Sequence, residues 1–174
     1  TYDLGASGWG NNEWQNYTNS PENSSVADGY LTITARQEGS GYTSARLKSQ
    51  GLQSFQYGRM DIRAKLPEGQ GIWPAIWMLG DNINDVGWPA CGEIDIMEHV
   101  GFERDSIFGT PHTEAFNGMI FTQKTGSIEI LDSEDEFHTY TIDWKKDRID
   151  WYVDEHHYHT FHKTKDHFAY WPFD

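Results

Sequence analysis

The sequence has a single cysteine, Cys91, among its 174 residues, so it cannot form an internal disulfide bond. It also has only 13 Lys and Arg against 27 Asp and Glu, which gives a formal net charge of -14. This balance excludes the usual electrostatic attraction to nucleic-acid backbones and anionic membranes. No apolar run is long enough to cross a bilayer. We therefore expect neither nucleic acid nor membrane among the partners, whereas an uncharged polymer is compatible with the charge.

The number of aromatic side chains is high for so polar a chain. They make up 15% of the residues, and eight of them are tryptophans. A chain of 174 residues can build one domain with a hydrophobic core and is hardly long enough for two, so we expect a single domain over residues 1–174. Some tryptophans will belong to that core. The excess predicts flat apolar surfaces of the kind on which the C–H faces of sugar rings pack.

Hydrophobic residues recur with a period of two along most of the chain, which is typical of half-buried β-strands. The segments that show this alternation are residues 31–35, 60–66, 140–144 and 149–153. Turn-forming clusters such as Pro67-Glu68-Gly69 and Lys145-Lys146-Asp147 separate them, and a hairpin is expected at Asp154-Glu155. No segment shows a helical stripe. The pattern predicts an all-β fold, either an antiparallel sandwich or a barrel.

Three acidic residues fall close together in the segment 92–101. In a regular strand, Glu93 and Asp95 lie on one face, and the isoleucine that follows each of them lies on the other. Glu98 has the wrong parity for the acidic face. One extra residue near Met97, forming a β-bulge, would return Glu98 to the face of the other two acids and would bend the strand.

Carboxylates that share one face repel each other, so a strand without a use for them should avoid the arrangement. Two carboxyl groups about 5–5.5 Å apart suit double displacement, in which one attacks an anomeric carbon and the other protonates the leaving oxygen. Neighbouring negative charge would keep the acid protonated near neutrality. We therefore predict a retaining glycoside hydrolase that cuts a polysaccharide within its chain. The alternative is an edge strand whose acids face water.

A second strand that could contribute to a binding site lies in the segment 71–80. Trp73 and Trp77 share one face of this strand, and Ile76 and Met78 lie on the other. If the Ile/Met face belongs to the core, both tryptophans line a groove as platforms for sugar rings. The alternative is that the tryptophan face itself is the core.

Two long runs surround these positions. They are Gly71-Ile72-Trp73-Pro74-Ala75-Ile76-Trp77-Met78-Leu79-Gly80 and Gly87-Trp88-Pro89-Ala90-Cys91-Gly92-Glu93-Ile94-Asp95-Ile96-Met97-Glu98. Shorter runs of the same kind are Trp9-Gly10-Asn11-Asn12-Glu13, Thr43-Ser44-Ala45-Arg46-Leu47, Gly109-Thr110-Pro111-His112-Thr113, Trp151-Tyr152-Val153-Asp154 and Trp171-Pro172-Phe173-Asp174. These runs are spread from Trp9 to Asp174 and resemble glycoside hydrolase family 16, most closely its laminarinase branch, the endo-β-1,3-glucanases. The resemblance extends over essentially the whole chain. The extra residue at Met97 is absent from the lichenase branch, although agar- and carrageenan-cutting relatives also carry one.

The resemblance implies a β-jelly-roll sandwich of two curved antiparallel sheets, similar to concanavalin A, with an open cleft and retention at the anomeric carbon. It implies that Glu93 is the nucleophile, Asp95 the assisting carboxylate and Glu98 the general acid/base. It further implies sugar contacts from Asn12, Arg46, Trp73, Trp77, Trp88 and His112.

Four of the implied sugar contacts also have plain structural interpretations. Asn12 fits a turn, and Arg46 fits a surface ion pair. Trp88 fits an anchor for a loop, and His112 fits a histidine whose hydrogen bonds are satisfied within the fold. The residues alone leave these alternatives open.

The polysaccharide partner implied by the resemblance is a β-1,3-glucan such as laminarin, with mixed-linkage β-1,3-1,4-glucan as a further substrate. The alternatives are a non-catalytic β-glucan-binding protein of the same fold, a transglycosylase, or a hydrolase of agar or carrageenan. Retaining hydrolysis by two carboxyl groups needs no cofactor. The structural calcium frequent in the family draws its ligands largely from terminal strands that have no counterpart here, so the calcium ligands stay unassigned.

The resemblance also bears on what surrounds the chain. Relatives usually carry further strands before the counterpart of Thr1 and after that of Asp174, so we expect residues 1–174 to be an incomplete catalytic domain. Thr1-Tyr2-Asp3 has neither the basic start nor the apolar stretch of a signal peptide, and the expected extracellular location rests on the family alone. A monomer is expected.

Overall fold

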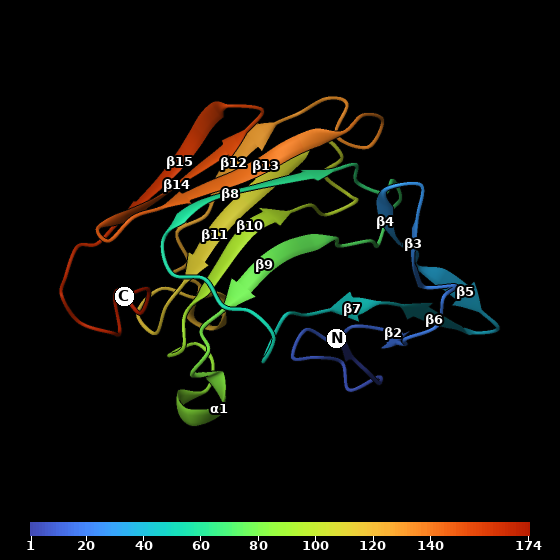
Figure 1. Cartoon of the computed structure of the whole chain (residues 1–174), viewed down its shortest axis with the longest axis horizontal. Coiled ribbons are helices and arrows are strands. Elements are labelled where there is room, and N and C mark those ends of the chain that lie inside the picture. The colour runs from blue at the N-terminus through green and yellow to red at the C-terminus, as the bar shows by residue number, and fades with distance from the viewer. The chain divides into compact units, whose positions relative to one another are not determined.

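The computed structural model describes all residues from Thr1 to Asp174. The chain divides into two compact units, Thr1–Ser54 and Phe55–Asp174, and we describe each by itself (Figure 1). The prediction of one domain over residues 1–174 stays a prediction. No helix in the chain has the length and apolar character that a membrane span requires.

The unit Thr1–Ser54 consists of short strands in three small sheets. Its strands are β1 (Tyr2–Asp3), β2 (Gln15–Tyr17), β3 (Ser24–Ala27), β4 (Tyr30–Ile33), β5 (Arg36–Glu38), β6 (Gly41–Ser44) and β7 (Arg46–Leu47). Strands β1 and β7 pair antiparallel, β3 and β4 form a hairpin, and β6 lies between β5 and β2, with β2 parallel to β6.

The strand predicted over residues 31–35 is present only in part, and its expected half-burial is wrong. The strand β4 ends at Ile33, and every residue in it is exposed. The physical reason is that β4 pairs only with β3, so its sheet has two strands and covers neither of its own faces.

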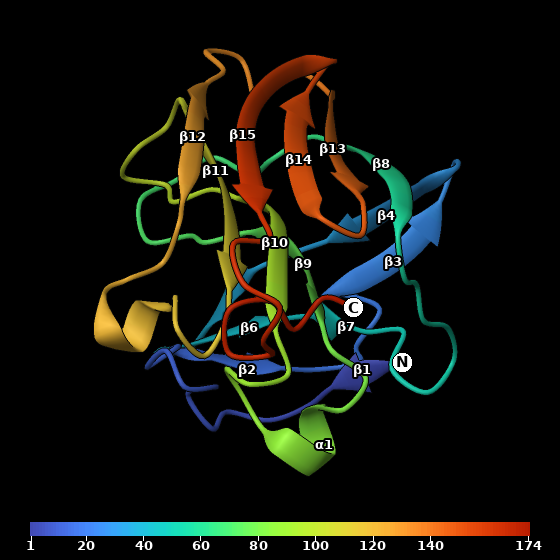
Figure 2. The same cartoon turned by 90° about the vertical axis from the view of Figure 1, so that its left-hand side faces the viewer.

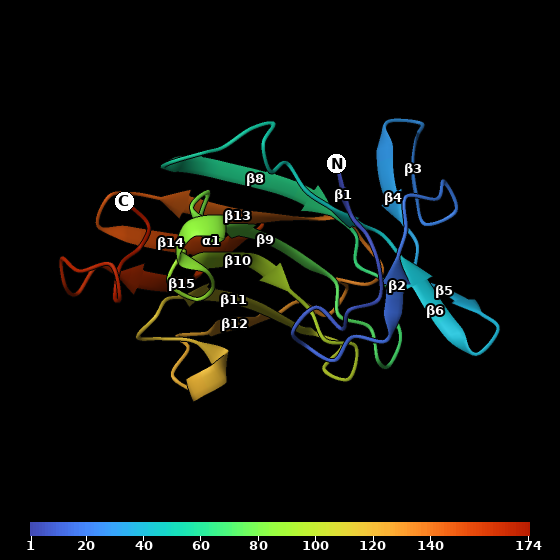
Figure 3. The same ribbon diagram turned by 90° about the horizontal axis from the view of Figure 1, so that it is seen from below.

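The unit Phe55–Asp174 contains two four-stranded antiparallel sheets. The first has the order β12-β11-β10-β9, and Figure 3 shows these strands side by side. Its strands are β9 (Ala75–Leu79), β10 (Glu93–Glu98), β11 (Ser106–His112) and β12 (Gly126–Glu129). The second has the order β15-β14-β13-β8, with β8 (Gly58–Ala64), β13 (His138–Trp144), β14 (Arg148–Val153) and β15 (His156–His162). The only helices are α1 (Ile83–Val86) and the 3₁₀ turn η1 (Gly118–Ile120).

The predicted strands of this unit are confirmed, and their turns explain the pairing. Tyr140 pairs with Val153, and the hairpin that follows β14 turns at Asp154 and Glu155. Both turn residues have positive φ, 46° and 67°, which is the backbone twist that a tight two-residue hairpin requires.

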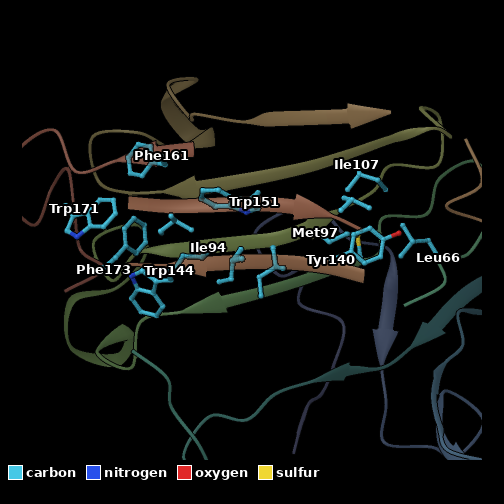
Figure 4. Packing of buried hydrophobic residues seen from close by; sticks show 14 residues of the cluster. Leu66, Ile94, Met97, Ile107, Tyr140, Trp144, Trp151, Phe161, Trp171 and Phe173 are labelled. Atoms are coloured by element: carbon cyan, nitrogen blue, oxygen red, sulfur yellow. The ribbon is translucent and has the colours of Figure 1, made fainter. Parts of the chain in front are cut away.

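Figure 2 shows the strands of both sheets, and the hydrophobic core lies between these sheets (Figure 4). Ile94, Ile96 and Met97 of β10 and Ile107 of β11 belong to it on one side, and alternate residues of β13 and β14 on the other. Its most deeply buried members are Met97, Ile107, Tyr140, Ile142, Ile149, Trp151 and Val153. The predicted all-β sandwich is therefore confirmed, and it leaves the outer face of β10 free to carry polar groups.

The core explains which hydrophobic side chains stabilise this unit. We expect Ile142→Ala, which removes a fully buried side chain from the central strand β13, to lower the free energy of unfolding by about 2–5 kcal/mol. The matched control Ile120→Ala, at a side chain that is 55% exposed, should change it by no more than about 0.5 kcal/mol. Denaturant titration measures both, and equal losses would contradict the assignment of the core.

Candidate active site

The strand β10 contains a one-residue shift in register at the centre of the acidic segment. Against β9, Asp95 pairs with Trp77 and Met97 pairs with Ile76, so Ile96 has no partner residue. Against β11, Asp95 pairs with Thr110 and Glu98 with Phe108, and one residue of β11 therefore lies opposite two of β10. This is the β-bulge that the parity of the acids predicted.

The bulge places the three acids on the same face of the sheet. Glu93 and Glu98 are half-buried, and Asp95 is only 2% exposed. The two residues of the bulge, Ile96 and Met97, both point into the core, where they are 2% and 1% exposed. The sequence prediction named Met97 as the extra residue, and the pairing with β9 assigns the unpaired position to Ile96.

Two indole groups donate hydrogen bonds to the outer acids. Trp73 Nε1 donates to Glu98 Oε1 at 3.0 Å, and Trp88 Nε1 donates to Glu93 Oε2 at 2.5 Å. Both rings remain partly exposed, 57% for Trp73 and 37% for Trp88. Each indole therefore binds a carboxylate through the N–H group at its ring edge, while a face of the ring stays accessible to a ligand.

Asp95 connects the remaining groups of the site. Its carboxyl shares a hydrogen bond with that of Glu93, and its Oδ2 lies 3.1 Å from Nε2 of His112. His112 is the residue of β11 that pairs with Glu93, and its ring centre lies 6.0 Å from that of Trp88. The site is thus one connected group of three carboxyls, an imidazole and two indoles.

Burial and mutual repulsion raise the pKa values of all three acids. Burial is the largest cause for Glu93, whose pKa rises from 4.5 to about 8 with a further contribution from the charge of Asp95. Burial also raises the pKa of Asp95 well above its ordinary value, with the charge of Glu98 as the second cause. The pKa of Glu98 is raised by burial, while the hydrogen bond from Trp73 opposes the shift.

The consequence of these shifts is that the cluster keeps protons near neutral pH. Coupled carboxyls lose their protons in steps that belong to the group, so ionised and neutral acids coexist over a broad pH range. An ionised carboxylate can act as a nucleophile, and a neutral one on the same face can act as a general acid.

The same face can also chelate a cation. Glu93, Asp95 and His112 each offer one ligand atom, and these atoms lie within 4.8 Å of one another. Two of these ligands are acids for which the resemblance implies a catalytic role, so a metal ion here would occupy the same carboxyl groups. The absence of a catalytic cofactor and the structural calcium both stay predictions.

The other residues implied by the resemblance lie in different places. Trp77 pairs with Asp95 on the acid-bearing face, and Ile76 and Met78 pack against the core, so the expected parity of β9 is confirmed. Asn12 and Arg46 belong to the unit Thr1–Ser54, and their contacts with sugar stay predictions.

Within their own unit, both residues have structural roles. Asn12 is an exposed turn residue with φ of 57°. Arg46 donates to Asp3 at 3.1 Å, and its guanidinium lies 4.8 Å from the centre of the Trp9 ring. The ion pair and the turn that the sequence left open as alternatives are therefore both present.

Sequence reasoning missed two residues that act on the acidic strand. The Thr110 side chain hydrogen-bonds to Glu98 and lowers its pKa. Trp151, which the sequence placed only in a half-buried strand, donates from its Nε1 to the backbone carbonyl of Asp95 at 2.8 Å. The isolated glycine of β11, Gly109, was the available signal, because glycine within a strand often marks a close approach by another group.

One surface recess of this unit lies apart from the acids. This recess, of about 520 Å³, is lined by Glu68, Gly69, Gln70, Gly101, Phe102 and Arg104 and contains none of them. The carboxyls lie instead along the face of a sheet, where a polymer can bind without entering an enclosed pocket.

A family model described as glycosyl hydrolases family 16 matches residues 11–174, a range that includes every group of this site. The chain belongs to glycosyl hydrolase family 16.

Individual relatives agree with the family. A β-glucanase of Rhodothermus marinus is 47% identical over 99% of this chain and 64% of its own length. The laminarinase of a Flavobacterium species is 48% identical, with a TM-score of 0.94 over 100% of this chain and 76% of that structure. A non-specific endo-β-1,3(4)-glucanase crystallised with a glucan oligosaccharide is 44% identical, with a TM-score of 0.96 over 100% of this chain and 72% of that structure.

These matches confirm the jelly-roll fold that the resemblance implied. They also show that the chain spans less than two thirds of the length of the Rhodothermus β-glucanase.

The raised pKa of Glu93 has a consequence for stability. Between its ordinary value of 4.5 and about 8, the folded chain binds a proton that the unfolded chain has lost, so stability falls as the pH rises through this window. Glu93→Gln cannot ionise and escapes this loss. We expect it to raise the melting temperature above that of the wild type by about 2–6 °C at pH 8, and to change it little at pH 4.5.

Thermal unfolding followed by circular dichroism at the two pH values measures this difference. The control Glu129→Gln changes an exposed glutamate of the same sheet and should have no such pH-dependent effect. A wild type that is the more stable protein at pH 8 would contradict the assigned direction of the pKa shift.

Proposed function

We propose that this protein is a retaining endo-β-1,3-glucanase in which Glu93 is the nucleophile and Glu98 the general acid/base. The observation that carries the proposal is the bulge of β10, which brings both glutamates and Asp95 to one face of the sheet with raised pKa values. Two carboxyl groups that project from one face of the sheet and flank a glycosidic bond are the requirement for double displacement.

In the first step, ionised Glu93 attacks the anomeric carbon and Glu98 gives its proton to the leaving oxygen. Asp95 assists because it shares a hydrogen bond with Glu93, and the attacking form is the one in which their common proton lies on Asp95. His112 orients Asp95 from the neighbouring strand. The products are a covalent glycosyl–enzyme ester and the released end of the glucan.

In the second step, the loss of charge at Glu93 changes the role of Glu98 from acid to base. Esterified Glu93 carries no charge, so the repulsion that raised the pKa of Glu98 decreases and Glu98 becomes a base. It accepts a proton from water, and the water oxygen attacks the anomeric carbon from the face that the leaving group left. Two inversions give net retention.

The substrate class rests on what the relatives act on. The three described above are a β-glucanase, a laminarinase and a non-specific endo-β-1,3(4)-glucanase, which supports β-1,3-glucan as the main substrate and mixed-linkage glucan as a second. The partly exposed rings of Trp73 and Trp88 support a sugar-binding role beside the acids. The partner is therefore a neutral polysaccharide.

The remaining properties follow from this substrate. A long glucan cannot enter a cell, so the proposed location is extracellular. Catalysis by carboxyl groups alone requires no cofactor, and a structural calcium ion, if the protein has one, would act on stability. We propose that the protein works as a monomer.

Substitution of the two glutamates tests the roles. We expect Glu93→Gln to lower kcat on laminarin by at least about 10³-fold while leaving glucan affinity nearly unchanged, because the amide cannot form the ester. Glu98→Ala should also be slow on laminarin, and with a dinitrophenyl β-laminarioside, whose phenolate leaves without protonation, azide should restore turnover by attacking the ester without base catalysis, giving a β-glycosyl azide. Substantial activity in Glu93→Gln would exclude it as the nucleophile.

A comparison of polysaccharides tests the substrate. Reducing ends released from laminarin, mixed-linkage β-glucan, agarose and carrageenan are measured with the wild type and with Glu93→Gln as the inactive control. We expect laminarin to be cleaved fastest. Binding of laminarin without cleavage would favour a glucan-binding protein, and transfer to an added acceptor sugar would favour a transglycosylase.

A further inference from the structure

The acidic strand is held from its core side by one indole group. Trp151 of β14 belongs to the opposite sheet, is fully buried and lies in the middle of the core (Figure 4). Its Nε1 donates to the backbone carbonyl of Asp95 at 2.8 Å. This is a hydrogen bond from one sheet to the backbone of the other, made inside an apolar core where such a bond is difficult to replace with water.

The carbonyl that accepts this hydrogen bond lies directly before the bulge of β10. Asp95 is the last residue of β10 in register before the bulge, and the register on both neighbouring strands shifts immediately after it. The orientation of the backbone at this point decides whether Glu98 points to the acid-bearing face or into the core. A donor fixed at the Asp95 carbonyl therefore acts on the geometry of the catalytic pair.

The strand opposite the bulge is shaped to admit the indole. Gly109 of β11 lies across from the two bulge residues, Ile96 and Met97. A Cβ atom at Gly109 would lie 2.8 Å from Nε1 of Trp151, and closer still to its Cδ1. Only glycine leaves the space in which the indole reaches β10.

We propose that Trp151 is a positioning residue of the reaction, which holds the bulge of β10 through the Asp95 carbonyl and thereby directs Glu98 toward the glycosidic oxygen. This rests on the function proposed above. It predicts that loss of the indole N–H harms the proton transfer by Glu98 more than it harms folding or sugar binding.

The chain offers a matched control for this hydrogen bond. Trp144 of β13 is a second buried tryptophan of the same core, and its Nε1 has no hydrogen-bond partner. Trp151→Phe and Trp144→Phe both replace an indole with a smaller ring, but only the first removes a bond to β10. The difference between them isolates the hydrogen bond from the loss of packing.

The test compares leaving groups in the full-length protein. Laminarin leaves as a sugar alkoxide that needs protonation by Glu98, whereas a dinitrophenyl β-laminarioside releases a phenolate that does not. We expect Trp151→Phe to lower kcat/KM for laminarin by about 10-fold or more, a part of the 10²–10⁴-fold that acid catalysis contributes. For the dinitrophenyl substrate the change should stay within about 3-fold, and Trp144→Phe should affect both substrates equally.

A second measurement does not depend on turnover. Carboxyl-carbon NMR follows the titration of Glu98 in the wild type and in both variants. We expect its midpoint to move in Trp151→Phe and to stay in place in Trp144→Phe. If the wild type cleaves no glucan but the midpoint moves, the proposed function fails, and what stands is that the Trp151 hydrogen bond sets the surroundings of Glu98.

Other outcomes overturn the positioning role. Equal losses on both substrates together with an unchanged Glu98 midpoint would make Trp151 a packing residue only. Near-UV circular dichroism checks folding, and Gly109→Ala is a second variant, because its Cβ would displace the indole without removing it. Loss of the fold in both Trp151→Phe and Gly109→Ala would also count against the proposal, since the contact would then serve stability alone.

Discussion

The whole site depends on one shift of register in β10. Side chains in a strand alternate between faces, so residues an odd number apart can share a face only if the ladder contains an extra residue. Glu93 and Glu98 are five apart, and the unpaired Ile96 supplies the shift. Without it, a carboxyl would point into a core of isoleucine and tryptophan, where its ionised form would be strongly unfavourable. Fold and chemistry therefore share a single constraint.

The bulge is stable because it satisfies the core and the acidic face at the same time. Its two residues both bury their side chains, so the extra residue adds apolar contact in place of a void. On the other face, burial raises the pKa values of the three carboxyls, with their mutual repulsion as a further cause, and this opposes stability near neutral pH. A well-packed sandwich can tolerate this cost, and raised pKa values of this kind are typical of sites that carry out acid–base chemistry.

Much of the fold and of the candidate site could be predicted from the sequence, for a physical reason. Alternation of hydrophobic residues predicted the strands of the larger unit, and the parity of the acids alone required a bulge between Asp95 and Glu98. The exposure of β4 was not predictable, because burial depends on what covers a strand and alternation reports only the difference between its faces. The bond from Trp151 to Asp95 was also hidden, because it joins residues 56 positions apart on different sheets.

The tryptophan content takes on a more specific meaning in the structure. Composition suggested ring faces for sugars, but three indoles also use their N–H groups on β10: Trp73 on Glu98, Trp88 on Glu93 and Trp151 on the backbone of Asp95. These uses are compatible, because the N–H lies at the ring edge and a sugar packs on the face. A sugar bound on Trp73 or Trp88 would exclude water from the hydrogen bond beneath it. Since hydrogen bonds to charged groups strengthen as the local dielectric falls, binding of a sugar would itself strengthen the hydrogen bonds to Glu93 and Glu98.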